Sequence, residues 1–187
     1  MSPEDQVYPV EADTRLLLAA ALAELRPDDR VLEVGTGNGT IAAALVPSAD
    51  VMATDINPYA VAAARRLGVE VVRADLLAGI QGPFDFIVFN PPYLPTAPEE
   101  RVPDWMEQAL DGGPTGREVI ARFLREAGRV LAHGGRILLL VSSLTGMREV
   151  QDLIGAEGYS SEKIRSLVYE SEELMVLRIR RFPPERI

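Results

Sequence analysis

The tetrapeptide Asn90-Pro91-Pro92-Tyr93 combines residue types that suit chemistry on a planar nitrogen. The lone pair of an amide or aromatic amine nitrogen is delocalised, so such a nitrogen is a poor nucleophile and needs help from geometry. The Asn90 side-chain oxygen and the Pro91 carbonyl can accept its two N–H protons and hold the lone pair toward an electrophilic methyl group. Tyr93 offers a flat apolar face, and the paired prolines stiffen the loop. We predict these four residues as catalytic, with Asn90 and Tyr93 contacting the substrate.

A glycine-rich loop follows the first strand-like run, RVLEVG. Its glycines permit a tight turn and let a nucleoside-like ligand approach the backbone. A dinucleotide-binding loop would read G-x-G-x-x-G, but Thr40 stands three positions after Gly37, and Gly39 keeps an alternating spacing. This spacing favours S-adenosylmethionine over a nicotinamide cofactor. The loop residues predicted to contact that cofactor are Glu33, Gly35, Thr36, Gly37, Asn38 and Gly39.

Two aspartates stand where the next strand-like runs end. Asp55 follows the glycine loop by roughly twenty residues, where a carboxylate can accept both ribose hydroxyl protons. Asp75 ends the following run in the same way and can accept from the adenine amino group. Ile56 or Leu76 would pack on the adenine ring. With Asn57, these residues complete the predicted cofactor contacts from the strand ends.

The motifs need elements to position them, and strand-like and helix-like segments alternate along the chain. The strand-like runs are RVLEVG, DVMATD, VEVVRAD, FDFIVFN and RILLLVSS, then SEKIRSLVYE and ELMVLRIRR. Helices are expected after the cap-type residues Asp13 and Thr14, after Gly39, from Pro58 after its cap Asn57, and near 117–131 and 147–154. The alternation predicts an α/β fold with a doubly wound, mostly parallel seven-stranded sheet and a C-terminal antiparallel hairpin.

The chain length fits a single domain over 1–187, with an N-terminal segment and helix in 1–26 and the core in 27–187. The absence of cysteine and the lone His133 argue against a catalytic metal. The net charge of −9 makes nucleic acid the less favoured partner. The first residues lack an apolar signal core, so we expect a cytoplasmic protein without a membrane segment.

LEVGTGNG, TDIN, RADL and NPPY occur in this order, and the chain thereby resembles the Rossmann-like S-adenosylmethionine-dependent methyltransferases. The segments Tyr8–Thr14 and DGGPTGREVI (Asp111–Ile120) are similar to the HemK-like release-factor glutamine methyltransferases, in their compact archaeal and eukaryotic branch. That branch usually reads Y-x-P-x-E-D-T where this chain reads Y-P-V-E-A-D-T, so Val10 and Ala12 depart from the pattern.

The resemblance implies that Tyr8 and Thr14 contact the cofactor, Thr14 near its methionine carboxylate; the alternative for Thr14 is a helix cap. It also implies methylation of the glutamine N5 in the Gly-Gly-Gln motif of a class I peptide chain release factor, supported by a small zinc-binding activator. A physical hint for that partner is Val69–Ala74, which this fold would place at a sheet edge with unpaired backbone groups.

Two other functions stay open on the sequence. The same catalytic motif could serve N-methylation of an exocyclic amine of adenine or guanine in RNA or DNA, although no basic groove is evident. A non-catalytic cofactor-binding subunit is the alternative of another class, and the intact motifs disfavour it. His133 is interpreted as a turn residue, and Trp105 is either a wall of the substrate pocket or a packing anchor.

Overall fold

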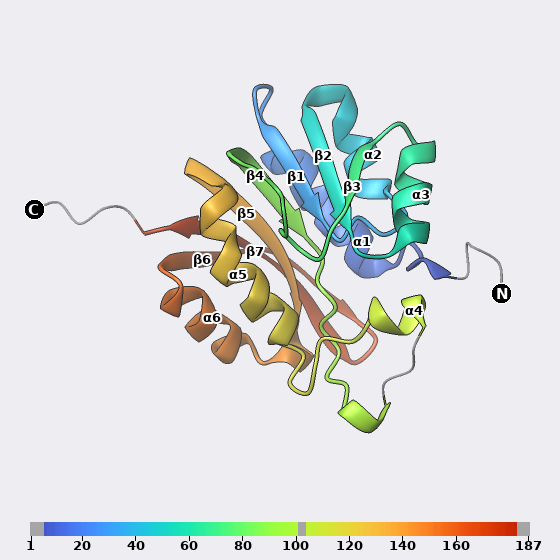
Figure 1. Cartoon of the computed structure of the whole chain (residues 1–187). Helices are drawn as coiled ribbons and strands as arrows, with labels where there is room; N and C mark the ends of the chain where they lie inside the picture. Colours follow the sequence, from blue (N-terminus) through green and yellow to red (C-terminus); the bar gives the residue numbers. More distant parts are fainter. Residues whose placement is uncertain (1–5, 101–103, 183–187) are drawn as a thin grey trace, which may run out of the picture.

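The computed structural model describes residues 6–100 and 104–182, and these form a seven-stranded sheet of order β3-β2-β1-β4-β5-β7-β6 (Figure 1). The strands are β1 (Arg30–Val34), β2 (Asp50–Asp55), β3 (Glu70–Arg73), β4 (Phe84–Phe89), β5 (Leu131–Ser142), β6 (Tyr159–Tyr169) and β7 (Glu172–Arg181). Strands β1 to β5 pair in parallel, whereas β7 is antiparallel to both β5 and β6. The predicted fold class is confirmed.

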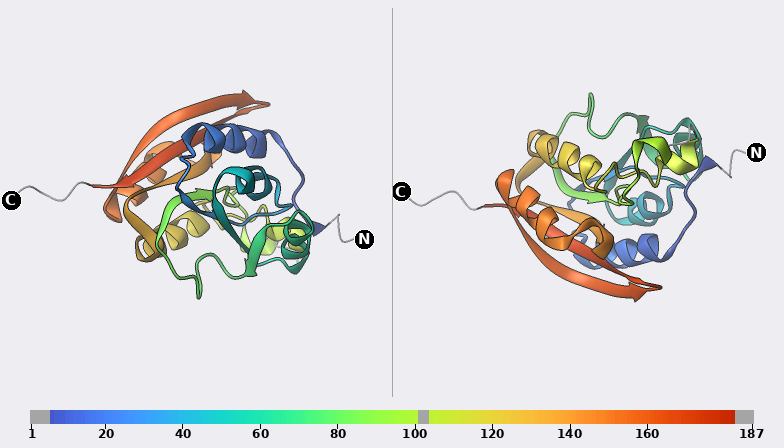
Figure 2. Two further views of the ribbon diagram at one scale, coloured as in Figure 1. Left: turned by 90° about the horizontal axis from the view of Figure 1, so that it is seen from above. Right: turned by 90° about the horizontal axis from the view of Figure 1, so that it is seen from below.

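Helices cover both faces of the sheet (Figures 1 and 2). Their bounds are α1 (Ala12–Glu24), α2 (Thr40–Leu45), α3 (Pro58–Arg66), α4 (Trp105–Gln108), α5 (Glu118–Val130) and α6 (Met147–Ala156), with 3-10 turns at Val46–Ser48, Pro98–Glu100 and Ser143–Thr145. Helices α1, α2 and α3 pack into one apolar cluster, and α5 and α6 pack into a second. None of the described helices combines the length and the apolarity needed to cross a bilayer.

Strand β4 contributes to both apolar clusters because successive side chains of a strand point to opposite faces. Phe86 and Val88 pack with α1, α2 and α3, whereas Ile87 and Phe89 pack with α5 and α6. This explains why FDFIVF is apolar at nearly every position, as expected for a parallel strand buried on both faces.

The pairing of β1 with β4 fixes where the functional loops leave the sheet. Val34 lies opposite Phe89 in this parallel pair, and Val34 also lies opposite Thr54 in the pair of β1 with β2. The glycine loop and the Asn90 loop therefore start beside one another, at the point where the strand order reverses. This is where open parallel sheets bind ligands.

The start of α1 differs from the sequence prediction. The helix begins at Ala12 with Glu11 as its N-cap, so Asp13 and Thr14 lie inside the first turn and are not its caps. The reason is that the Asp13 carboxylate faces the protein interior, where it binds groups outside the helix. The predicted cap of α3 is confirmed, because the Asn57 side chain accepts from the Tyr59 amide at 2.9 Å.

Strand β5 also begins earlier than predicted. It starts at Leu131, and residues 132–135 form an irregular stretch within its bounds, because Leu131 pairs with Phe84, Arg136 pairs with Phe86, and Gly134 has a φ of +80°. A shift in register between Phe84 and Phe86 of the neighbouring strand accommodates this extension. His133 accordingly belongs to β5. The short helix α4 was not anticipated in the proline-rich segment.

A buried arginine connects several elements at the end of the sheet away from the glycine and Asn90 loops. Arg136 of β5 is 1% exposed and forms an ion pair with Asp29 at 2.6 Å. It also donates to the Glu24 carbonyl at the end of α1, and its guanidinium lies 4.2 Å from the centre of the Phe86 ring. The cluster thus joins α1, the loop before β1 and two central strands.

We predict that Asp29→Ala lowers the free energy of unfolding by about 3–5 kcal/mol, because it removes the close carboxylate partner of the buried Arg136 and leaves only the Glu24 carboxylate at 3.9 Å. Urea titration followed by circular dichroism would measure the loss. Asp50→Ala is the control, since the Arg30–Asp50 pair spans 3.5 Å with side chains 41% and 75% exposed. That change should cost at most about 1 kcal/mol. Equal effects of the two substitutions would contradict the assignment.

Candidate active site

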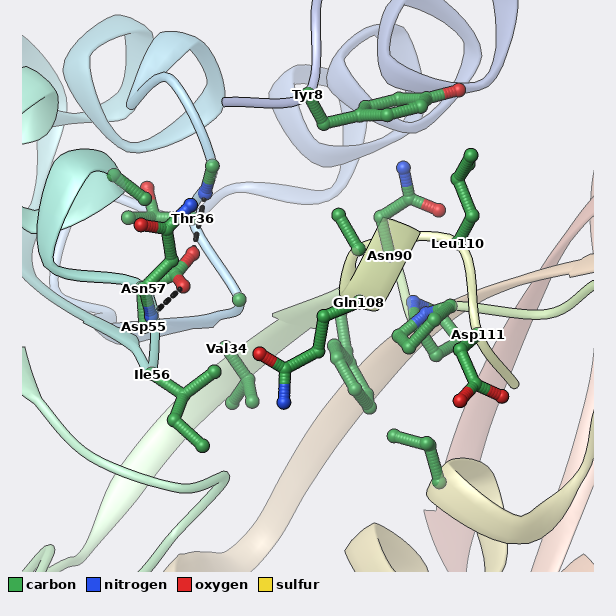
Figure 3. A pocket seen from close by; sticks show the side chains of 18 of the residues that line it. Tyr8, Val34, Thr36, Asp55, Ile56, Asn57, Asn90, Gln108, Leu110 and Asp111 are labelled. Carbon is green, nitrogen blue, oxygen red and sulfur yellow. Dashed lines mark hydrogen bonds between the residues drawn. The ribbon is translucent and has the colours of Figure 1, made fainter. Parts of the chain in front are cut away.

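A cavity of about 420 Å³ opens at the carboxyl edge of the central strands. Its walls come from the N-terminal segment, the glycine loop, the residues after β2, β3 and β4, helix α4 and the start of α5. Figure 3 shows Asp55 and Ile56 on one side and Asn90, Leu110 and Asp111 on the other. The two predicted halves of the site therefore face one cavity.

The glycine loop has the backbone conformation that its sequence requires. Gly35 and Gly37 have φ angles of +65° and +56°, in the left-handed region where side chains are strained. A Cβ atom added at Gly37 would meet nothing within 4 Å. Gly39 differs, because an added Cβ would lie 2.8 Å from the Ala64 Cα of α3. Gly39 does not line the cavity, and the structure shows it packed closely against α3; its predicted cofactor contact stays a prediction.

The carboxyl group of Glu33 is buried beneath the loop. Its Oε2 accepts from the Thr36 hydroxyl at 2.5 Å and from the Ala42 amide of α2 at 2.9 Å. Burial raises the pKa of Glu33 to about 8; the two hydrogen bonds lower it, and the nearby Asp55 charge raises it further. Glu33 thus fixes the loop against α2 while remaining an acid that titrates near neutral pH.

Asp55 connects the ends of β1 and β2. Its Oδ2 accepts from the Gly37 amide at 2.8 Å and its Oδ1 from the Asn57 amide at 2.9 Å (Figure 3). Burial raises the pKa of this carboxyl, and the backbone hydrogen bonds oppose that shift. Asp55 is only 9% exposed yet lines the cavity.

Asp75 lies on the loop two residues beyond Arg73, the last residue of β3, and is not the strand terminus that the sequence predicted. Its Oδ2 accepts from Arg122 of α5 at 2.6 Å. The pair joins the loop after β3 to α5, and both residues are part of the cavity lining. Leu76, the next residue, adopts a φ of +51° and also lines the cavity.

Asn90 presents a polar atom that the fold leaves unpaired. Its Nδ2 donates to Asp13 Oδ2 at 3.0 Å. Its Oδ1 is buried and has no hydrogen-bond partner within residues 6–100 and 104–182. A buried acceptor without a partner is unfavourable unless a ligand supplies the donor. The cavity beside Asn90 can hold such a ligand.

Two tyrosines flank Asn90 in the lining. The Tyr8 hydroxyl donates to Asp13 Oδ2 at 3.2 Å, and the Tyr8 carbonyl accepts from the Asn38 side chain at 3.3 Å. Burial raises the pKa values of Tyr8 and Tyr93, and the Asp13 charge raises both further. Both phenols therefore stay protonated in the range where enzymes work, and neither can serve as a base.

The segment DGGPTG holds the Asn90 loop by close backbone contact. The Gly112 amide donates to the Leu94 carbonyl at 3.0 Å. A Cβ added at Gly112 would lie 2.9 Å from the Pro92 carbonyl oxygen, and one at Gly116 would lie still closer to the Tyr93 carbonyl oxygen. Only glycine allows this approach, so these glycines support the catalytic loop.

The structure brings together every predicted site residue except Gly39. It also adds lining residues that were not predicted as site residues, among them Asp13, Trp105, Gln108, Leu110, Asp111 and Arg122. The lining position of Trp105 favours a wall of the pocket over a distant packing anchor. Asp13 carried a usable signal, because the sequence placed it among the residues matching a family motif, but it was assigned only as a helix cap.

Comparison with known proteins agrees with this geometry. The family model "Methyltransferase small domain" matches residues 9–105. A Methanocaldococcus jannaschii protein provisionally named protein N5-glutamine methyltransferase is 37% identical, over 89% of this chain and 88% of its own. The mouse methyltransferase HEMK2 is 36% identical over 92% of this chain and 88% of its own. The Deinococcus radiodurans release factor glutamine methyltransferase is 45% identical over 68% of this chain, and the match spans only 51% of its own length.

Among solved structures, the E. cuniculi Mtq2-Trm112 complex, described as responsible for methylation of the eRF1 translation termination factor, superimposes with a TM-score of 0.80. The match covers 95% of this chain and 99% of the other at 31% identity. A Pyrococcus furiosus methyltransferase, at 21% identity and a TM-score of 0.65, shares the fold; that match covers 89% of this chain and 81% of the other. The motifs, the cavity and these relatives together establish that the chain belongs to the HemK-like family of Rossmann-like methyltransferases.

Proposed function

We propose that this enzyme methylates the side-chain N5 of the glutamine in the Gly-Gly-Gln motif of a class I peptide chain release factor, with S-adenosylmethionine as the methyl donor. The observation that carries the proposal is the buried Oδ1 of Asn90 beside the cavity, which has no partner among the described residues. A glutamine side chain ends in an NH₂ group, which supplies the donor that this oxygen lacks.

Asn90 and Pro91 then act on the substrate nitrogen. One N–H donates to Asn90 Oδ1 and the other to the Pro91 carbonyl, which leaves the nitrogen lone pair free to point along the cavity. Tyr93 packs against the planar amide, and Pro92 keeps the loop rigid. The nitrogen lone pair forms the new N–C bond as the sulfonium S–C bond breaks, which releases the neutral thioether, and the methylated nitrogen then loses one proton to water. Since neither neighbouring tyrosine is basic enough to take a proton beforehand, alignment and hydrogen bonding supply the rate enhancement in this proposal.

The other half of the cavity fits S-adenosylmethionine, which supplies an electrophilic methyl group on its sulfonium. The open side of Gly37 leaves room for close approach of a ligand to the loop backbone. The Asp55 oxygens retain lone pairs for the ribose hydroxyls, and the Asp75 oxygen that Arg122 does not hold accepts from the adenine amino group. In this proposal the cofactor site is completed by further residues that line the cavity. They are Tyr8, Thr14, Glu33, Gly35, Thr36, Asn38, Ile56, Asn57 and Leu76.

The names of the relatives support the choice of substrate. They describe glutamine methylation for the archaeal and Deinococcus proteins and methylation of eRF1 for the Mtq2-Trm112 complex. N-methylation of a base in RNA or DNA remains the second candidate, and the net charge of −9 disfavours it. We place the reaction in the cytoplasm, where release factors act.

A small zinc-binding activator would fit the edge of the sheet at β3. This strand ends the sheet, so one side of its backbone is open to pairing with a partner. Val72 is 39% exposed on it, and Leu67 and Ile56 nearby are 54% and 38% exposed. An apolar edge of this kind is unfavourable in water, and the Mtq2-Trm112 complex gives a precedent for a partner protein.

The first experiment offers purified enzyme a release factor, RNA and DNA with S-adenosylmethionine carrying a labelled methyl group. Parallel reactions contain or omit a small zinc-binding partner protein. We expect label on the Gly-Gly-Gln glutamine, located by mass spectrometry, and a higher rate with the partner present. Label confined to RNA or DNA would reject the protein substrate.

Asn90→Ala should lower kcat at least about a hundredfold, because it removes an acceptor that holds the substrate nitrogen in the transition state. Cofactor affinity, measured by calorimetry, should stay within about twofold of wild type, since the change lies at the substrate end. A large loss of cofactor affinity with little change in kcat would show that the role of Asn90 is misassigned.

Glu33 should make the stability of the cofactor-free protein fall as pH rises. The pKa of this carboxyl is 4.5 in model compounds and about 8 in the fold, so within this window the folded state binds one more proton than the unfolded state. The free energy of unfolding then falls by about 1.4 kcal/mol per pH unit through this group. Urea titrations from pH 5 to pH 8 should show a shallower slope for Glu33→Gln. Parallel slopes would contradict the assignment.

A further inference from the structure

We infer that Asp13 is a positioning residue that determines which end of the Asn90 side-chain amide faces the substrate. The inference rests on the proposed function, because it assigns Asn90 Oδ1 to the substrate nitrogen. It adds a buried carboxylate from the first turn of α1 to a motif that lies on the loop after β4.

The contacts of Asp13 reach well beyond its own helix. The residue is 2% exposed, and its Oδ2 accepts from Asn90 Nδ2 at 3.0 Å and from the Tyr8 hydroxyl at 3.2 Å. Its Oδ1 accepts from the Thr14 amide at 2.5 Å and from the Thr14 hydroxyl at 3.2 Å. All four groups are donors, so the site is built around a group that only accepts.

An asparagine amide can be placed in two orientations that have nearly the same shape. With Nδ2 toward Asp13, the pair forms a hydrogen bond, and Oδ1 is left as a buried acceptor without a partner among the described residues, in a side chain that lines the cavity. In the reverse orientation Oδ1 would face the Asp13 carboxylate, and two acceptors would oppose one another. The Asn90 NH₂ would then face the NH₂ of a glutamine substrate, and the site could not hold the nitrogen.

Helix stabilisation alone does not account for this carboxylate. An acidic residue in the first turn of a helix interacts favourably with the helix dipole even when it is exposed. Asp13 is instead buried against Asn90, 77 positions away in the chain. The same carboxylate raises the pKa values of Tyr8 and Tyr93 beside the cavity, as expected for a negative charge at the substrate end. The position of the Asp13 carboxylate therefore agrees with a role in orienting the Asn90 amide.

Exchanging the two residues tests this role. Asp13→Asn removes the obligate acceptor, so the Asn90 amide is no longer held in one orientation, and kcat should fall about tenfold to a hundredfold. Asn90→Asp places two carboxylates together and should be at least as impaired. In the double variant, the amide introduced at position 13 donates to one oxygen of the carboxylate introduced at position 90, and the other oxygen still accepts from the substrate.

The double variant should therefore recover about tenfold or more in kcat over Asn90→Asp, with cofactor affinity within about twofold of wild type throughout. Glu11→Gln is the control, because it removes a charge from the same helix end without a hydrogen bond to Asn90. It should change kcat less than about twofold. A double variant as poor as the two losses multiplied would overturn the inference.

A measurement without substrate separates this inference from the proposed function. The side-chain NH₂ signals of Asn90 can be identified in a ¹⁵N–¹H spectrum by their loss in Asn90→Asp. One of these protons should exchange slowly with water in the wild type and rapidly in Asp13→Ala. Unchanged exchange would reject the role of Asp13. Slow wild-type exchange that Asp13→Ala abolishes, in an enzyme that does not label a release factor, would reject the substrate and leave Asp13 in place.

Discussion

The parallel pairing of β1 with β4 is the constraint on which the site depends. Because Val34 lies opposite Phe89, the glycine loop and the Asn90 loop emerge at the same height from adjacent strands. Helices α2 and α5 then continue on opposite faces, so the backbone diverges and leaves a crevice between the loops. One loop can hold a nucleoside and the other a planar nitrogen, and the shape of one loop does not depend on the shape of the other. The separation of the two loops is thus set mainly by sheet geometry.

The lining of the crevice is strongly acidic. Its described residues hold six carboxyl groups, from Asp13, Glu33, Asp55, Asp75, Asp111 and Glu118, against the single guanidinium of Arg122. Burial of Glu33 and Asp55 disfavours their charged forms, so gathering these carboxyl groups carries an electrostatic cost. A cationic sulfonium relieves that cost, which favours the methyl donor over its neutral thioether product. The same field repels phosphate groups and agrees with a protein substrate.

Most of the sheet, and nearly all residues that line the glycine-loop side of the cavity, could be predicted from the sequence, because they depend on local patterns. Asn57-Pro58 marks a helix start, and FDFIVF marks a strand buried on both faces. Predictions failed where the decisive contact was distant in the chain. Asp13 is a residue type that often caps helices, but in the fold it is buried and accepts a hydrogen bond from Asn90. Gly39 belongs to the loop motif, but the fold packs it against Ala64 of α3 and leaves it out of the cavity lining. Asn90 and Ala64 lie in other segments of the chain, so the local sequence around Asp13 or Gly39 does not indicate these contacts.

Strand β7 has a consequence for how the chain is made. It is synthesised after the six other strands, yet it lies between β5 and β6 and pairs with β5 over Ser142 to Ile137. During translation the long, apolar β5 therefore presents an open edge until β7 has left the ribosome. The glycine loop and the Asn90 loop are synthesised long before that moment. A nascent chain would thus contain all the residues of the candidate site before β7 completes the sheet. It would have to add β7 quickly, so that the open edge of β5 does not pair with other chains.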